Sequence, residues 1–347
     1  MTVAPPLRTA LIGFGLSGRD FHAPFIQADP RYSLDFIVTG SEERAARAHA
    51  AYPDTAVLAS TAELFGRAGQ LDLVLVCTPP ASHIELAAAA IGHGLNVVVD
   101  KPFAATSAAA QELIGQARQA GVVLTVYQNR RWDADFLTLR ELIGDGELGQ
   151  VHLFESRFER WSPHGLRAWK SSAGIADGGG ILFDLGSHLI DQALQLFGPV
   201  ATVYGETARH IRAEESDADD DAFVSLLHES GVRSHLSANL VSALQLPRFH
   251  VLGSSAAYTK WGMDGQEAAL AAGLLPTDPG YGVEPEEAWG KLGVPGNIRK
   301  VPAQQGAYPE FYRQLAAALA GDGPVPVDPA DAVAVLRIIE EVHRQAG

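Results

Sequence analysis

The hydrophobic and polar positions of the first 125 residues alternate between two kinds of segment. Five short runs are apolar at nearly every position: Thr9–Gly13, Leu34–Val38, Leu71–Cys77, Leu95–Val99 and Val122–Val126. Alanine-rich stretches of helical length lie between them: Ser41–Tyr52, Ser82–Gly92 and Ser107–Ala120. Strands that are apolar on both faces and alternate with helices are typical of βαβ units. This half of the chain therefore predicts a parallel sheet covered by helices on both sides.

A different pattern begins after residue 130. Segments in which polar and apolar residues alternate indicate strands with one wet face: Gly149–Arg160, Val200–Thr207, Phe223–His228, Val232–Asn239 and Arg248–Leu252. Helices are predicted over four segments: Asp135–Ile143, Ile181–Phe197, Pro309–Ala320 and Pro329–Gln345. Residues 262–307 are rich in glycine and proline and are predicted to form long loops.

Composition and charge narrow the possible functions. The chain has 347 residues, and its formal net charge of -15 disfavours binding to nucleic acid or to an anionic membrane. Cys77 is the single cysteine, so no internal disulfide can form, and no Cys/His cluster has the spacing of a zinc site. No apolar run reaches the roughly 18 residues of a membrane span. We expect a cytoplasmic protein without a metal site, in which the acidic run Glu214–Asp221 is a solvated loop.

A glycine-rich turn follows the first predicted strand. The residues Gly13, Phe14, Gly15, Leu16, Ser17 and Gly18 match the pattern G-x-G-x-x-G. The pattern alone is weak, but here it closes a strand and opens a helix, where backbone N–H groups can approach a pyrophosphate. We interpret it as the phosphate-binding loop of a nicotinamide dinucleotide.

The end of the second strand bears on the choice of cofactor. NAD-binding domains carry an acidic residue in this region, which accepts hydrogen bonds from the free ribose hydroxyls. The segment Val38–Arg44 has no acid at its first positions, whereas Ser41 and Arg44 can bind a 2′-phosphate. The sequence favours NADP, and NAD stays the alternative because Glu42 and Glu43 can take the role of the acid.

Two further segments carry groups suited to acid–base chemistry. Lys101 follows an apolar strand, at the edge where ligands bind in open α/β sheets. Asp184 and His188 are four residues apart in a predicted helix and so share one face. An imidazole oriented by a carboxylate can act as a general base near neutral pH. Each segment alone is also compatible with a structural role, as a salt-bridged lysine or a buried histidine.

Together these motifs resemble those of the Gfo/Idh/MocA oxidoreductases. The resemblance rests on the glycine turn, on Asp100–Pro102, where the family usually has Glu-Lys-Pro, and on G-G-x-x-x-D-x-x-x-H over residues 179–188. It extends over nearly the whole chain. The segments Asn129–Asp133 and Tyr308–Tyr312 are most similar to the branch that holds NADP-dependent scyllo-inositol dehydrogenases.

The resemblance implies an NAD(P)-dependent dehydrogenase that oxidises a secondary hydroxyl of a cyclic polyol or sugar. Lys101, Asp184 and His188 match the family's catalytic triad. In that triad His188 takes the hydroxyl proton, Lys101 holds the oxygen and Asp184 tunes the pair by hydrogen bond. A homo-oligomer, dimer or tetramer, is also implied. Two alternatives stay open: an NAD-dependent glycosidase that retains its cofactor, and a non-catalytic nucleotide-sensing regulator of the same fold.

Other residues are expected around the cleft. Expected cofactor contacts follow strand ends of the first domain: Thr78, Pro79, His83, Lys101, Asn129 and Arg130. Expected substrate contacts come from both halves of the chain: Lys101, Arg160, Trp169, Asp184 and His188.

The predicted fold class is α/β with two domains. Residues 1–127 form an N-terminal Rossmann domain, and residues 128–347 form a C-terminal α/β domain for substrate binding and oligomerisation. We expect the second domain to contain an open, largely antiparallel sheet and its last helix to pack back on the first domain.

Overall fold

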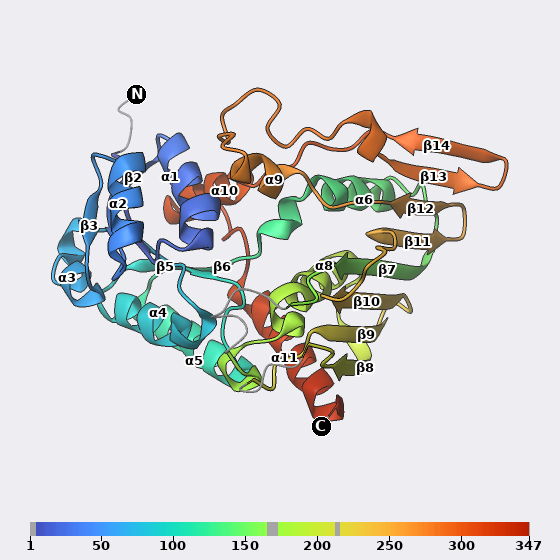
Figure 1. Cartoon of the computed structure of the whole chain (residues 1–347), viewed down its shortest axis with the longest axis horizontal. Coiled ribbons are helices and arrows are strands. Elements are labelled where there is room, and N and C mark those ends of the chain that lie inside the picture. The colour runs from blue at the N-terminus through green and yellow to red at the C-terminus, as the bar shows by residue number, and fades with distance from the viewer. Residues whose placement is uncertain (1–4, 165–172, 212–215, 347) are drawn as a thin grey trace.

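Two β-sheets with their own helices form the protein (Figure 1). The structure is a computed structural model in which residues 5–164, 173–211 and 216–346 are described. The six-stranded sheet lies on the left of Figure 1 and the eight-stranded sheet on the right. The predicted α/β class with an N-terminal parallel sheet is confirmed.

The first sheet is parallel throughout. Its strands lie in the order β3 (Ala56–Leu58), β2 (Tyr32–Val38), β1 (Leu7–Ile12), β4 (Leu73–Val76), β5 (Asn96–Asp100) and β6 (Leu124–Tyr127). This order is that of a Rossmann fold, whose ligands bind beyond the carboxyl ends of the strands. The five predicted strands correspond to all of these except β3, which is too short to give a hydrophobic pattern.

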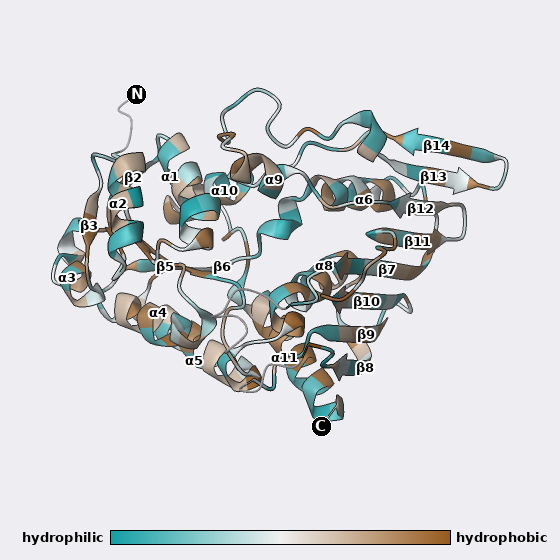
Figure 2. Cartoon of the chain, viewed as in Figure 1, coloured by the Kyte–Doolittle hydropathy of each residue, from teal (hydrophilic) through white to brown (hydrophobic). Residues whose placement is uncertain are grey.

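Helices cover both faces of this sheet (Figure 1). They are α1 (Ala23–Ala28), α2 (Glu42–Ala51), α3 (Thr61–Phe65), α4 (His83–Gly92) and α5 (Ser107–Ala120). Burial on both faces explains the continuous apolar runs, since every residue of β4 is buried. In Figure 2 brown segments, which mark hydrophobic residues, are accordingly visible at β5 and β6.

The second sheet is mixed rather than simply antiparallel. Its strands lie in the order β14 (Asn297–Val301), β13 (Gly290–Val294), β12 (Ala257–Lys260), β11 (Phe249–Gly253), β7 (Val151–Glu159), β10 (Arg233–Asn239), β9 (Asp221–His228) and β8 (Val200–Ala208). The central pair β7 and β10 runs parallel, while its neighbours pair antiparallel. The expected largely antiparallel sheet is supported in part: the pairing of β7 with β10 is parallel, because the chain between them crosses over through a helix and two other strands.

The remaining α-helices among the described residues are α6 (Ala134–Gly144), α8 (Ser187–Phe197), α9 (Gln266–Ala271), α10 (Pro309–Leu319) and α11 (Pro329–Ala346). α8 packs against β7 and β10, and α11 contacts both α5 of the first sheet and β8 of the second. The prediction of long loops over residues 262–307 is wrong in part, because this region contains α9 and the hairpin β13–β14. The hairpin is mostly exposed and has too few apolar positions to show a strand pattern.

The acidic run before β9 is not simply a solvated loop. Asp219 is 5% exposed and Asp220 is 6% exposed. The Asp217 carboxylate accepts the backbone N–H of Ile175 at 2.8 Å, and that of Asp220 accepts two backbone N–H groups. Buried carboxylates that accept backbone N–H groups fix loop conformation. The sequence alone does not distinguish carboxylates that are buried and accept backbone N–H groups from carboxylates that are exposed to solvent.

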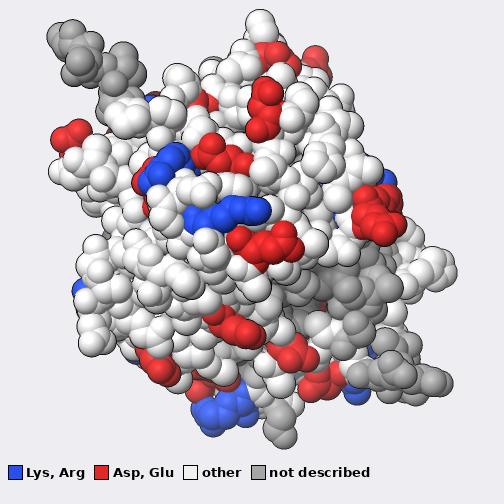
Figure 3. Space-filling model, turned by 90° about the vertical axis from the view of Figure 1, so that its left-hand side faces the viewer, with Lys and Arg blue, Asp and Glu red and all other residues white. Residues whose placement is uncertain are grey.

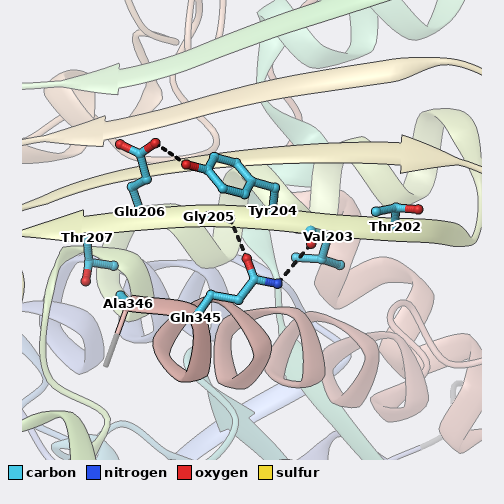
Figure 4. Close-up of a pocket in the computed structure, with 8 residues that line it drawn as sticks. All are labelled: Thr202, Val203, Tyr204, Gly205, Glu206, Thr207, Gln345 and Ala346. Atoms are coloured by element: carbon cyan, nitrogen blue, oxygen red, sulfur yellow. Dashed lines mark hydrogen bonds between the residues drawn. The ribbon is translucent and has the colours of Figure 1, made fainter.

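A groove runs along the edge strand β8 where it meets the end of α11 (Figure 4). The side-chain amide of Gln345 donates to the Val203 carbonyl at 3.0 Å and accepts the backbone N–H of Gly205 at 3.0 Å. Gly205 lies directly beneath α11, since a Cβ there would be 2.5 Å from Val342. The groove contains no predicted site residue.

The described surface agrees with the acidic composition. On the face shown in Figure 3, acidic side chains are scattered and the basic ones form no broad patch among the residues drawn in colour. In the described parts of the chain, no helix is both long and apolar enough to cross a membrane.

Candidate active site

The glycine turn between β1 and α1 leaves its middle glycine open to a ligand. Gly13 has φ +100°, and a Cβ there would be 2.7 Å from the Cys77 carbonyl oxygen. A Cβ at Gly18 would be 2.1 Å from the Gly13 oxygen. At Gly15, in contrast, nothing lies within 4 Å. The outer glycines thus permit the turn and the close approach of the helix, and Gly15 leaves bare backbone where a pyrophosphate fits.

The other residues of the turn differ in their exposure. Phe14 is 2% exposed and packs edge-on against Tyr52, so only its backbone can reach a ligand. Leu16 is exposed and Ser17 is half-buried at the start of a π-helical segment, Ser17–His22, which continues into α1. The first N–H groups of a helical segment have no partner within the helix, which makes its start a suitable site for an anion.

The second strand ends beside the first turn of α2. The Ser41 hydroxyl caps α2 by accepting the backbone N–H of Arg44 at 3.4 Å. Glu43 forms an ion pair with Arg47 on the exposed side of the helix. The Arg44 side chain is exposed in the first turn of α2, which follows the carboxyl end of β2. A positive group and a helix N-terminus thus adjoin the region that reads the adenine ribose in Rossmann folds.

His83 joins the two strand-end loops after β4 and β5. Its Nε2 lies 2.8 Å from the Thr78 carbonyl oxygen and its Nδ1 lies 2.9 Å from the Pro102 carbonyl oxygen. The side chain is 1% exposed. Burial lowers the pKa of His83. Pro79 is exposed beside it and Thr78 accepts the hydroxyl of Ser82 at 2.7 Å. His83 therefore holds the loop that carries Lys101, and its predicted cofactor contact stays a prediction.

Lys101 lies directly after β5, and its ammonium meets a carboxylate from the second half of the chain. Nζ donates to Asp184 Oδ1 at 2.9 Å and to the Asp184 carbonyl oxygen at 2.5 Å. The Lys101 side chain is 17% exposed and that of Asp184 is 19% exposed, so both are accessible to a small molecule. The structure brings together two of the three predicted triad members, which are 83 positions apart in sequence.

Asp184 and His188 lie at the junction of two helical geometries. Asp184 belongs to a π-helical segment, Leu182–Gly186, and His188 is the second residue of α8. π-Helical turns are rare and occur frequently at functional sites. The wider turn alters the register that a simple α-helix predicts for the two side chains. The described hydrogen bond of the Asp184 carboxylate is made to Lys101, rather than to His188 as expected.

His188 is held in a buried, positively charged environment. The side chain is 4% exposed, and within the described residues its Nδ1 has no hydrogen-bond partner. Burial holds the pKa of His188 well below its usual range, and the positive charges of Lys101 and Arg130 lower it further, against the opposing effect of Asp184. The neutral imidazole that this environment favours has one ring nitrogen that can accept a proton.

Two buried arginines lie next to this helix. Arg130 donates to Asp133 at 3.2 Å and to Glu267 at 2.9 Å, and its guanidinium lies 4.7 Å from the Phe158 ring. Arg248 also contributes to the lowered pKa of His188. Sequence reasoning named Arg130 but missed Arg248, which stands in no recognisable motif.

Gln192, one turn after His188 on α8, connects these arginines. Its Nε2 donates to the Arg130 carbonyl oxygen at 2.9 Å, and its Oε1 accepts from Arg248 Nη2 at 2.6 Å. The Gln192 amide thereby attaches α8 to the segment after β6, which contains Arg130, and to the segment before β11, which contains Arg248. Sequence reasoning missed Gln192 as well, although its spacing of four from His188 could have found it.

The other predicted contacts are less defined. Asn129 is buried after β6, beside Arg130. Arg160 follows β7 directly, and its guanidinium lies 5.1 Å from the Phe158 ring. Trp169 lies outside the described residues. In the described part of the chain, no group of three or more His, Cys, Asp or Glu side chains is arranged to hold a metal ion.

A dinucleotide-type glycine turn, with a lysine and a buried histidine beyond the strand ends, defines the class of nicotinamide-dependent oxidoreductases. The chain belongs to the Gfo/Idh/MocA family. Residues 7–128 match the model described as oxidoreductase family, NAD-binding Rossmann fold, and residues 136–259 match the GFO/IDH/MocA C-terminal domain. The resemblance inferred from sequence is confirmed, and the chain is an NAD(P)-dependent dehydrogenase acting on CH–OH groups.

Relatives align over almost the whole chain. One is the scyllo-inositol 2-dehydrogenase (NADP(+)) IolW of Bacillus subtilis, 34% identical over 96% of this chain and 92% of the relative. The uncharacterized oxidoreductase YdgJ of Escherichia coli is 37% identical over 96% of this chain and 94% of the relative. The solved structure of the putative oxidoreductase yvaA from Bacillus subtilis superposes with a TM-score of 0.91, covering 100% of this chain and 97% of that one at 31% identity.

Proposed function

We propose that this enzyme oxidises a secondary hydroxyl of a cyclic polyol or sugar, inositol-like in shape, to a ketone, reversibly and with NADP. The observation that carries the proposal is the contact of Lys101 with Asp184, next to the neutral His188. The relative named as an NADP-dependent scyllo-inositol dehydrogenase supports the substrate class.

Each member of the triad has a distinct role in this proposal. Lys101 holds the substrate oxygen through its ammonium, and Asp184 fixes that ammonium by its two hydrogen bonds. His188 takes the hydroxyl proton, because burial and neighbouring positive charge keep it neutral. When bound, the nicotinamide ring supplies the hydride acceptor. Withdrawal of the proton by a positioned base contributes typically about 10² to 10⁴-fold in rate.

The lowered pKa of His188 predicts the pH dependence of oxidation. His188 must be neutral to take a proton, and the neutral fraction falls as the pH drops through its pKa. Because this pKa lies well below 6.5, kcat/KM for polyol oxidation should keep its plateau below pH 6.5. Measuring kcat/KM from about pH 5 to about pH 9 shows the pH at which the activity begins to fall on the acid side. An acid limb at or above pH 6.5 would contradict a neutral, buried base.

The cofactor is held, in this proposal, by the backbone of Gly13–Gly18 and by Ser41 and Arg44. The open space at Gly15 and the exposed arginine at the end of β2 support this assignment. Thr78, Pro79, Asn129 and Arg130 stay proposed contacts nearer the nicotinamide, and Arg160 a proposed substrate contact.

Arg44→Ala should weaken NADP binding about tenfold or more and leave NAD binding nearly unchanged, because a guanidinium binds the 2′-phosphate that NAD lacks. Fluorescence titration of the two reduced cofactors measures both affinities. Arg47→Ala is the matched control, since Arg47 is on the same helix but pairs with Glu43. Equal losses of NADP and NAD affinity in the Arg44 variant would contradict the proposed NADP preference.

The domain boundary and the assembly are also proposals. A boundary after residue 127 is supported by the end of β6 at Tyr127. A homo-oligomer, dimer or tetramer, would form through the face of the second sheet that carries no helix in Figure 1. Tyr204, 52% exposed, and Leu227, 42% exposed, lie on this sheet and support an interface there.

A substrate screen tests the proposed function. The purified enzyme is incubated with inositol isomers and with aldoses, each with NADP or NAD, and the absorbance of the reduced nicotinamide is followed. We expect net reduction of NADP with at least one cyclic polyol. A parallel incubation with glycosides tests the alternatives: a glycosidase that retains its cofactor and returns the hydride would release sugar from a glycoside without net reduction of added cofactor, and a regulator would neither release sugar nor reduce the cofactor.

A further inference from the structure

Asp219 holds the start of the helical segment that carries Asp184 and His188. Its Oδ1 accepts the backbone N–H of Leu182 at 2.8 Å, and its carbonyl oxygen accepts the N–H of Ile181 at 2.8 Å. The first N–H groups of a helix have no partner within the helix. Asp219 satisfies two of them from another part of the chain, 37 residues away.

The glycine run before the helix is shaped by this contact. Gly180 has φ +99°, and a Cβ there would be 2.8 Å from Asp219 Oδ2. A Cβ at Gly179 would be 2.2 Å from the Ala173 carbonyl oxygen, and one at Gly178 would be 3.2 Å from Pro80 Cβ. These glycines therefore allow close packing on Asp219 and on the loop after β4.

The second oxygen of Asp219 is bound by the C-terminal helix. His343 Nε2 lies 2.9 Å from Asp219 Oδ2, and the His343 ring packs on Phe183 with centroids 5.6 Å apart. Phe183 is the neighbour of Asp184 in the π-helical segment. Through His343, α11 thus contacts both Asp219, which caps the π-helical segment, and Phe183 within that segment.

The same face of α11 is attached to the first domain. Glu340, three residues before His343, accepts the backbone N–H of Ser107 at 2.6 Å and its hydroxyl at 2.7 Å. Ser107 begins α5, six residues after Lys101. Residues three apart share one face of a helix. α11 therefore connects two parts of the site. Glu340 binds Ser107, which follows Lys101, and His343 binds Asp219, which caps the helical segment that carries Asp184 and His188.

We propose that Asp219 and His343 are positioning residues of the active site, which hold the segment from Ile181 to His188 where Asp184 meets Lys101. This inference rests on the proposed function. The carboxylate satisfies the helix N-terminus and complements its positive dipole end, while His343 fixes the carboxylate from α11. Neither residue touches the reacting atoms. Their effect is on the placement of the catalytic groups, to which rates are sensitive.

Asp219→Ala should lower kcat about tenfold or more, with the dissociation constant of NADP unchanged, because a small displacement of catalytic groups costs rate rather than cofactor affinity. Asp219→Asn keeps an acceptor oxygen and should retain more of the activity. His343→Phe keeps the ring packing on Phe183 but loses the hydrogen bond, and should lower kcat about threefold.

The neighbouring Asp220 provides the matched control. It is equally buried and also accepts backbone N–H groups, from His210 at 2.9 Å and Ile211 at 2.6 Å, both outside the catalytic segment. Asp220→Ala should keep kcat within about twofold of wild type when rates are normalised to the folded fraction from thermal unfolding. Equal losses of kcat in the Asp219 and Asp220 variants would overturn the proposal.

A double-mutant cycle separates positioning from general structural damage. His188→Ala alone should lower kcat, which tests the proposed function independently. If Asp219 acts through the catalytic segment, adding Asp219→Ala to His188→Ala should lower kcat by much less than it does in wild type. A full multiplicative loss would overturn the inference and leave the proposed function intact. If Asp219→Ala does not fold, Asp219→Asn and His343→Phe complete the same cycle.

Discussion

Replacing Lys101 with alanine should lower the turnover of the polyol by about 10²-fold or more while leaving NADP affinity nearly intact. The ammonium that holds the substrate oxygen disappears, and Asp184 loses the partner that its carboxylate binds at 2.9 Å. Loss of this positive charge should also raise the pKa of His188, because Lys101 is the charged group that lowers that pKa most. The glycine turn lies on another strand end and is unaffected.

Steady-state kinetics and fluorescence titration of NADPH measure the two quantities for the Lys101 variant. Its residual activity should show an acid limb at higher pH than that of wild type, since the positive charge next to His188 is gone. Lys291→Ala is a suitable control because Lys291 is exposed on β13, in the outer hairpin. Wild-type turnover in the Lys101 variant would remove the central support for the proposed chemistry.

Replacing His188 with alanine should also lower turnover by about 10²-fold or more, because the alcohol then loses its base. Cofactor affinity should change little. The matched control is His228→Ala, since His228 is likewise buried, at 1% exposure, but is bonded to the Gly198 carbonyl and the Ser234 hydroxyl at the far end of α8. The control should lose thermal stability and keep its specific turnover.

Both histidine variants are compared by stopped-flow turnover and by thermal unfolding. If His188→Ala keeps wild-type turnover while His228→Ala loses it, the base lies elsewhere. Substitution of both Lys101 and His188 should cost less than the product of the single losses, because the two groups act on the same oxygen and proton.

Much of the first sheet could be predicted because its strands are buried on both faces. β4 is apolar at every position, and α5 has the bounds that its alanine-rich pattern predicts. The second sheet was harder, since the pairing of β7 with β10 depends on a long crossover. The strands of the β13–β14 hairpin are close in sequence, so their pairing is local. They are mostly exposed, however, and their sequence resembles that of a loop.

Site residues could be predicted where they stand in a short sequence motif. Contacts between segments that are far apart in sequence could not be predicted. Lys101, Asp184 and His188 each stand in a motif, so they could be named. The direct contact of Lys101 with the Asp184 carboxylate depends on how the two halves pack, and on a π-helical turn that no periodicity reveals. Arg248 and Gln192 stand in no motif, and Asp219 lies in an acidic run that was expected to be a solvated loop. Only the folded structure shows that Arg248 bonds to Gln192 and that Asp219 bonds to the backbone of Leu182.

The amide of Gln345 has a consequence for how copies of this chain can associate. It occupies, at Val203 and Gly205, the same donor and acceptor that an incoming β-strand would need in order to extend the sheet. Open edges of this kind otherwise recruit strands from other molecules and lead to fibrous aggregates. With this edge closed by one side chain, growth of the sheet from β8 is blocked at these positions. The homo-oligomer proposed above would therefore have to form through broad surfaces rather than by adding a strand at these positions.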